Sequence, residues 1–164
     1  MLALRGLRKS LPATPPRILF SDVELDLAAG EFVAVMGESG SGKSTLLNLI
    51  AGLDRADAGS IHFDAADIGR MSDDERAEYR RHHLGFVFQA FHLLPYLGLA
   101  DNAALPLLLA GVPAPERTRR VGDMLARVGM AQRGASRPHE LSGGEMQRVA
   151  IARAPVHAST LGLG

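Results

Sequence analysis

The stretch Gly37-Glu38-Ser39-Gly40-Ser41-Gly42-Lys43-Ser44-Thr45 decides the fold of this 164-residue chain. It matches the phosphate-binding loop pattern G-x-x-x-x-G-K-[ST], the Walker A motif. The short apolar run 32–36 before it is typical of a buried parallel strand. After it, apolar residues recur at helical spacing as far as Gly52, a residue type that often ends helices. A strand, a glycine-rich loop and a helix in this order predict an α/β nucleotide-binding domain.

The residue types of this loop suit a polyphosphate. Gly40 and Gly42 let the backbone curl so that successive N–H groups point inward. The following helix adds unpaired N–H groups and the positive end of its dipole. Lys43 is expected to reach the β- and γ-phosphates, and the Ser44 hydroxyl to ligate Mg²⁺. The alternative is a glycine-rich turn before an ordinary helix, but Lys43 is one of only two lysines in the chain, which makes a chance match less probable.

Composition sets broad limits on function. With 46% hydrophobic and 22% charged residues, the chain suits one globular domain with a core. The formal net charge of zero gives no general attraction to nucleic acid or anionic lipid. The absence of cysteine excludes disulfides and cysteine-ligated metals. No apolar run is long enough to span a bilayer and no signal peptide is recognisable, so the expectation is a cytoplasmic location.

Several strands are predicted around the loop. Strands are expected near residues 2–7, 23–27 and 60–63, the second half-exposed and antiparallel because apolar and acidic residues alternate. Three prolines make residues 12–16 a loop. Residues 84–89 are expected to form a buried strand that ends in Gln89. An amide at the end of a parallel strand lies at the edge where such folds bind ligands. A purely structural role for Gln89 remains the alternative.

Helices are predicted in the second half and just before it. Ser72 and Glu75 form a capping box, and Asp73 to Glu75 are interpreted as first-turn acids rather than metal ligands. A helical stretch over 101–111 is expected to break near Pro106, and residues 116–128 to form an amphipathic helix ended by Gly129.

A second anion-binding helix start is predicted at Ser142-Gly143-Gly144. One polyphosphate does not need two such sites in one subunit, so this one is expected to serve a nucleotide on another copy. An ordinary capped helix remains the alternative.

With these motifs in order, the chain resembles the ATP-binding subunit of ATP-binding cassette (ABC) transporters. The most specific match is the run Leu141-Ser142-Gly143-Gly144-Glu145-Met146-Gln147-Arg148-Val149-Ala150-Ile151-Ala152-Arg153-Ala154. The stretch 85–95 is similar to the branch that serves lipoprotein release, macrolide efflux and antimicrobial-peptide export.

The resemblance implies a P-loop NTPase core, a mixed sheet with flanking helices, plus a helical subdomain. The expected division is an ATP-binding core over 1–89, a helical subdomain over 90–142, and the signature helix and tail over 143–164. ATP and Mg²⁺ are the expected ligands, with Lys43 and Gln89 as catalytic residues and Ser44 and Gln89 on the metal. Ser142, Gly143 and Gly144 would close over the nucleotide of a second cassette in a head-to-tail dimer. Membrane-spanning subunits would hold the domain at the inner face of the plasma membrane.

The sequence also departs from the family pattern. The family's Walker B aspartate and following glutamate are expected just after residue 164, so the chain resembles a cassette that lacks its C-terminal core strands. Hydrolysis by it is therefore expected near background, and stability marginal. Leu11 stands where the family usually places an aromatic against adenine. One alternative is a non-catalytic module that pairs with a complete cassette. Another is a non-transport ABC ATPase of DNA repair or translation, which the net charge of zero does not favour because nucleic-acid binding requires basic surface.

Overall fold

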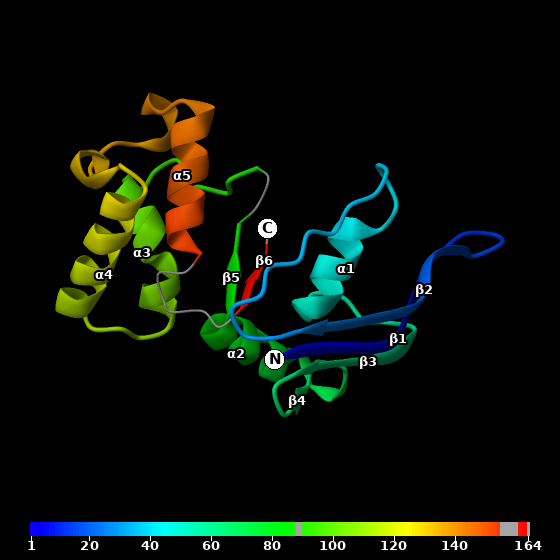
Figure 1. Ribbon diagram of the computed structural model, residues 1–164. Helices are drawn as coiled ribbons and strands as arrows, with labels where there is room; N and C mark the ends of the chain where they lie inside the picture. Colours follow the sequence, from blue (N-terminus) through cyan, green and yellow to red (C-terminus); the bar gives the residue numbers. More distant parts are fainter. Residues whose placement is uncertain (88–89, 155–160, 164) are drawn as a thin grey trace. The chain divides into compact units, whose positions relative to one another are not determined.

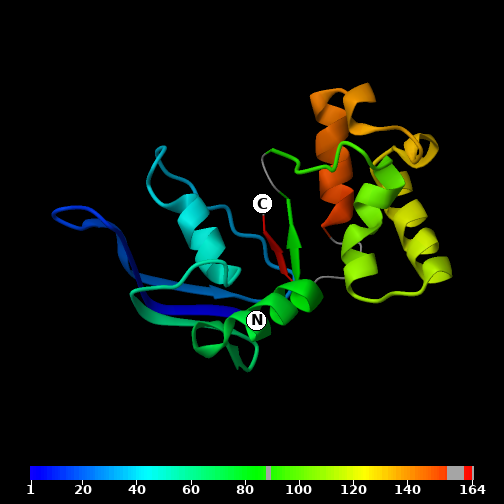
Figure 2. The ribbon, with the colours of Figure 1, turned by 180° about the vertical axis from the view of Figure 1, so that it is seen from behind.

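The computed structural model describes residues 1–87, 90–154 and 161–163. The chain divides into two compact units, Met1–Glu78 and Tyr79–Gly164 (Figures 1 and 2). The phosphate loop belongs to the first unit and the Ser142 motif to the second.

The first unit is built on a four-stranded antiparallel sheet in the order β2-β1-β3-β4. Its strands are β1 (Leu2–Leu11), β2 (Arg17–Leu27), β3 (Ala58–Phe63) and β4 (Ala66–Asp67). Leu2 lies between Leu27 on one side and Phe63 on the other. The strands predicted near residues 2–7, 23–27 and 60–63 are thereby confirmed.

Helix α1 (Lys43–Ile50) follows the phosphate loop and lies beside this sheet (Figures 1 and 2). The buried residues of α1 are Leu46, Leu49 and Ile50. Leu2, Leu4 and Leu7 of β1 are also buried, and so is Ile68 of the short helix η1 (Ile68–Arg70). The helix ends as predicted, because Gly52 takes a left-handed φ of 64° that terminates it. The core of the unit consists of Leu2, Leu4, Leu7, Leu46, Leu49, Ile50, Ile61, Phe63 and Ile68.

The strand predicted over residues 32–36 is wrong. These residues form no regular element, and Phe32 and Met36 are 91% and 88% exposed. A strand needs backbone hydrogen bonds from neighbours, and none of the described strands pairs with this segment. The apolar composition of residues 32–36 favours a strand, but the side chains of this run are exposed.

Helix α2 (Asp73–His83) spans the boundary between the units. The predicted capping box is present: Ser72 N–H donates to Glu75 Oε2 at 2.7 Å, and Glu75 N–H donates to Ser72 Oγ at 3.3 Å. The Asp73 carboxylate accepts from Arg55 at 3.2 Å and also pairs with the buried Arg76. These acids therefore serve the start of the helix.

The second unit holds a two-stranded parallel sheet, β5 (Leu84–Phe86) with β6 (Leu161–Leu163). The predicted strand over 84–89 is thus found over its first half, and Val87 N–H adds a bond to Leu163 O at 2.8 Å. Gln89 lies outside the described residues.

Three helices pack together in the second unit, namely α3 (Leu99–Leu109), α4 (Ala114–Arg127) and α5 (Gly143–Arg153). Short turns η2 (Ala131–Arg133) and η3 (Pro138–Glu140) precede α5. The amphipathic helix and the Ser142-capped helix are confirmed. Buried residues of the three helices, together with two residues outside them, form one cluster: Leu99, Ala103, Leu107, Val121, Leu125, Met130, Leu141, Val149 and Ala152. No helix among the described residues is both long and apolar enough to cross a bilayer.

The break expected near Pro106 does not occur, because α3 runs through it to Leu109. Proline removes only one N–H from the helix. Ala103 and Leu107 on either side are completely buried in the helical cluster, so packing holds the helix across the missing bond.

Candidate nucleotide-binding site

Glycine is required in the phosphate loop by both backbone and space. Gly40 and Gly42 have φ values of 78° and 96°, a left-handed conformation that side chains disfavour. A Cβ at Gly42 would lie 3.2 Å from ring carbons of Phe20. Leu46 N–H bonds to Gly42 O at 2.8 Å and starts α1 directly after the loop. The loop is thus an open curl that leads into a helix N-terminus.

Lys43 lies over this curl. Its Nζ donates to Gly37 O and Glu38 O, both at 2.8 Å. Residues 37–41 and Ser44 are exposed, and Lys43 and Thr45 are half-buried. An ammonium group, free helix N–H groups and a hydroxyl oxygen therefore meet at one accessible place. These groups fit a magnesium-bound polyphosphate, since they supply donors for phosphate and an oxygen for the metal.

Arg17 is a loop neighbour that sequence reasoning missed. Its guanidinium donates to Gly40 O at 3.3 Å, and in the sheet Arg17 is paired with Leu11, the residue at the expected adenine position. Leu11 is 39% exposed. No local pattern marks Arg17, because its partner Gly40 lies 23 residues further along the chain.

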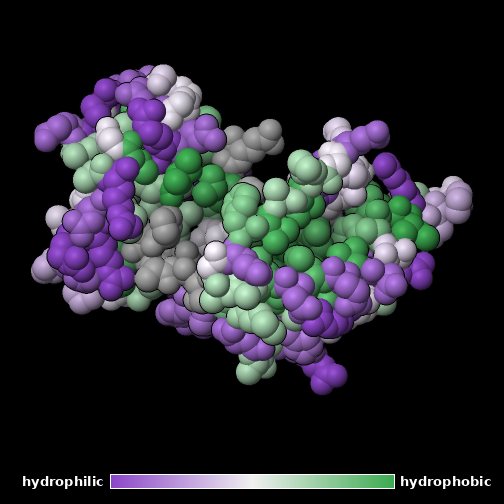
Figure 3. Space-filling model, in the orientation of Figure 1, coloured by the Kyte–Doolittle hydropathy of each residue, from purple (hydrophilic) through white to green (hydrophobic). Residues whose placement is uncertain are grey.

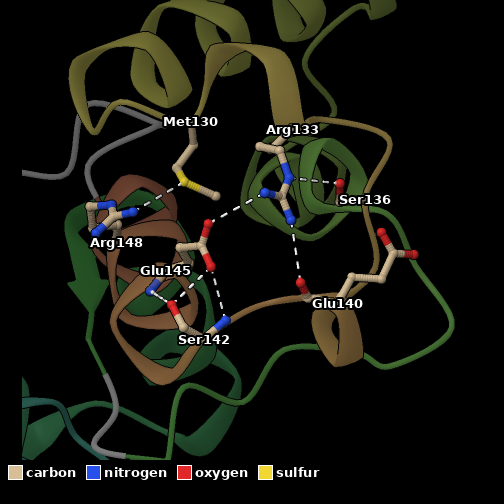
Figure 4. Close-up of polar contacts among 7 residues, drawn as sticks. All are labelled: Met130, Arg133, Ser136, Glu140, Ser142, Glu145 and Arg148. Carbon is tan, nitrogen blue, oxygen red and sulfur yellow. Dashed lines mark hydrogen bonds and ion pairs between the residues drawn. The ribbon is translucent and has the colours of Figure 1, made fainter.

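The second predicted anion site has the expected cap and an additional charged neighbour (Figure 4). Ser142 Oγ accepts from Glu145 N–H at 3.4 Å, and Glu145 Oε2 accepts from Ser142 N–H at 2.9 Å. Gly143 and Gly144 are exposed, and among the described residues nothing outside the local backbone lies within 4 Å of where a Cβ would stand. Arg133 Nη1 lies 3.4 Å from Glu145 Oε1.

The pKa of Glu145 is lowered, first by the Ser142 N–H, then by the Ser142 hydroxyl, with smaller contributions from the charges of Arg133 and Arg148. The carboxylate is thus ionised at neutral pH. Glu145 lay within the quoted signature run, but nothing local indicated that Arg133, twelve residues earlier, would contact it.

The segment after Gln89 is attached to the end of α5. Arg153 donates at 2.8 Å to Phe91 O and to His92 O, two consecutive residues with left-handed φ values of 59° and 46°. Burial lowers the pKa of the Arg153 guanidinium. No role was predicted for Arg153, because its partners lie more than sixty residues away.

Comparison with known proteins supports the same identification. The sequence pattern of the family described as "ABC transporter" matches residues 20–163. The chain is 47% identical over 156 residues to the pyoverdine export ATP-binding/permease protein PvdT of Pseudomonas aeruginosa, covering 94% of this chain and 24% of that protein. It is 45% identical over 154 residues to the macrolide export ATP-binding/permease protein MacB of Rhodopseudomonas palustris, covering 93% and 24%. The chain therefore spans about a quarter of the length of these curated relatives.

A solved structure also has this fold. The ATP-binding cassette MJ0796, determined as a dimer in a post-hydrolysis state with ADP and Pi, superposes with a TM-score of 0.87 at 36% identity. The match covers 97% of this chain and 71% of that one. Together with the phosphate loop and the capped signature helix, these matches show that the chain belongs to the ABC transporter family, whose cassettes are ATPases.

Proposed function

We propose that the chain is the ATP-binding domain of an exporter and that residues 37–45 hold the phosphates of MgATP. The observation that carries this proposal is Lys43, whose ammonium lies over a left-handed glycine curl at the start of α1. In this arrangement the loop N–H groups bind phosphate oxygens. Lys43 would exchange its two carbonyl partners for phosphate, and Ser44 would supply one oxygen to Mg²⁺.

The direction and cargo of transport rest on the relatives. Two curated relatives are named for pyoverdine export and macrolide export, which favours an exporter of small molecules over lipoprotein release or peptide export. Membrane-spanning partners would then hold the domain at the cytoplasmic face, and Gln89 would be the residue that reports the state of the nucleotide.

The exposed end of α5 is proposed to meet a second cassette. Ser142, Gly143 and Gly144 are all exposed at a helix N-terminus, and the related cassette MJ0796 was solved as a dimer. A head-to-tail pair would place this end over the γ-phosphate held by the other copy.

Hydrolysis by the 164-residue polypeptide is proposed to be near background. Phosphoryl transfer needs a metal-supporting carboxylate and an oriented water, and residues 154–164 contain neither aspartate nor glutamate. A phosphate-release assay on the pure polypeptide tests this, and turnover comparable with that of complete cassettes would contradict it.

Calorimetric titration with MgATP tests the binding proposal. Wild-type chain and Lys9→Arg are expected to bind alike, and Lys43→Ala is expected to lose saturable binding. Lys9 is the matched control because it is the only other lysine and its ammonium pairs with Asp54 rather than with a residue of the phosphate loop. Equal binding by Lys43→Ala would refute the assignment of the loop.

A further inference from the structure

The Ser142 hydroxyl is already occupied within its own chain. It donates to Glu145 Oε2 at 2.8 Å, and the same oxygen accepts the Ser142 N–H at 2.9 Å (Figure 4). A serine has a single hydroxyl proton. The hydroxyl therefore cannot donate to a phosphate oxygen until it leaves the carboxylate.

The carboxylate also opposes an incoming phosphate by its charge. Glu145 is in the first turn of α5, at the helix end where Gly143 and Gly144 leave N–H groups open. An anion bound at this helix end is stabilised by the positive end of the helix dipole. The negative charge of Glu145 already offsets part of that positive potential. Its side chain is only 24% exposed, so solvent screens the repulsion incompletely.

Arg133, which lies outside α5, partly neutralises the negative charge of the Glu145 carboxylate. Its Nη1 lies 3.4 Å from Glu145 Oε1, while Nε donates to Ser136 Oγ at 3.0 Å and Nη2 to Glu140 O at 3.3 Å. Hydrogen bonds to the η2–η3 segment thus hold the Arg133 guanidinium in place. The guanidinium attracts Glu145 Oε1, whereas Ser142 bonds to Oε2. The second nearby cation, Arg148, is directed at the Met130 sulfur at 3.7 Å.

We propose that Glu145 is a positioning residue that restrains the Ser142 hydroxyl, and that Arg133 sets the strength of this restraint. The inference rests on the proposed function, in which Ser142 engages the γ-phosphate on a second copy. Glu145 then determines how much nucleotide is needed before two cassettes close.

The test is ATP-dependent self-association of the full chain, followed by sedimentation velocity over a range of MgATP concentrations. Glu145→Gln keeps the capping box, since glutamine serves at this position, but removes the charge. It is expected to lower the MgATP concentration for half-maximal association about fivefold, the factor that separates a charge-assisted from a neutral hydrogen bond. Glu140→Gln is the matched control, because it removes one nearby charge that makes no contact with Ser142.

Arg133→Gln is expected to act in the opposite direction, raising that concentration about threefold because the carboxylate then holds Ser142 unopposed. In the Glu145→Gln background the same change should have a smaller effect, since little charge remains to balance. A gain in Glu145→Gln together with this non-additivity is not produced by simple loss of helix stability, which thermal melts of each variant check.

Binding of MgATP at protein concentrations too low for association separates this inference from the proposed function. All four variants are expected to bind MgATP as wild type does under those conditions. Equal association of wild type and Glu145→Gln, including none in either, would overturn the role of Glu145 and leave the phosphate-loop assignment intact. Loss of dilute MgATP binding in wild type would remove the proposed function and this inference with it.

Discussion

At the residue scale, backbone conformation and close contacts together disfavour a side chain at Gly37 and Gly42 of the phosphate loop. Gly42 combines a φ of 96° with Phe20 ring carbons 3.2 Å from where a Cβ would stand. Gly37 would bring a Cβ to 2.9 Å from Ser41 Oγ. The motif therefore reflects both backbone conformation and the packing of β2 against the loop.

Gly42→Ala is expected to destabilise the chain by about 1–3 kcal/mol, the usual cost of a strained backbone position, and to weaken MgATP binding. Gly122→Ala, at an exposed position inside α4 with nothing near a Cβ, should instead stabilise by about 0.5–1 kcal/mol. Urea denaturation of both variants measures the contrast. Equal effects would show that the left-handed conformation is not maintained in solution.

Leu11→Tyr is expected to tighten MgATP binding, since stacking of a base on an aromatic ring contributes about 1–3 kcal/mol in single-stranded nucleic-acid complexes. Leu11 is exposed and paired with Arg17, which contacts the loop at Gly40. Ile18→Tyr, at a residue that is 54% exposed on the next strand, is the control. An unchanged Kd for Leu11→Tyr in calorimetry would remove the adenine assignment.

At the element scale, the helix starts show how short-range signals are realised. Ser72 with Glu75 and Ser142 with Glu145 make the same reciprocal bonds at the starts of α2 and α5. Among the described residues, the Glu75 carboxylate bonds to Ser72 at its own helix start, whereas the Glu145 carboxylate is also contacted by Arg133. The same capping motif therefore has different charged neighbours at the two helix starts, because the surrounding elements differ.

Helix α4 begins with a charge cluster that makes stability depend on pH. Hydrogen bonds from Arg119 and Arg120 lower the pKa of Glu116 from 4.5 to about 2. Because the folded pKa lies below the unfolded one, this contribution is present above about pH 4.5 and is lost as pH falls towards 2. Glu116→Gln should therefore melt at a lower temperature than wild type at pH 7, and the gap should narrow at pH 3. A gap of constant size in melts followed by circular dichroism would contradict the ion-pair account.

At the scale of the whole molecule, the segment 32–36 was predicted to be a buried strand but is exposed and irregular. Its apolar side chains contribute to a hydrophobic surface on the first unit (Figure 3). Contiguous exposed apolar surface promotes association. We expect the 164-residue polypeptide to aggregate readily through this segment.

Phe32→Asp is expected to reduce aggregation severalfold without lowering the melting temperature, because the side chain is 91% exposed and makes little packing contribution. Leu109→Asp, at a residue that is 69% exposed on the second unit, is the matched control and should change aggregation less. Static light scattering during a temperature ramp compares them. Equal protection by both variants would show that net charge, rather than the segment 32–36, governs association.

The sequence alone determined the features whose causes lie within a few residues. These are the glycine curl and helix start at 37–50, the capping box of Ser72 and Glu75, the serine cap at Ser142, and the alternation that makes residues 23–27 of β2 half-exposed. Tertiary structure decided the rest: the missing pairing of 32–36, the unbroken helix at Pro106, and the contacts of Arg17, Arg133 and Arg153 with distant partners. The reason is physical, since caps and turns are satisfied by neighbours in the chain. Strand pairing and long-range ion pairs depend instead on which distant segments the fold brings together.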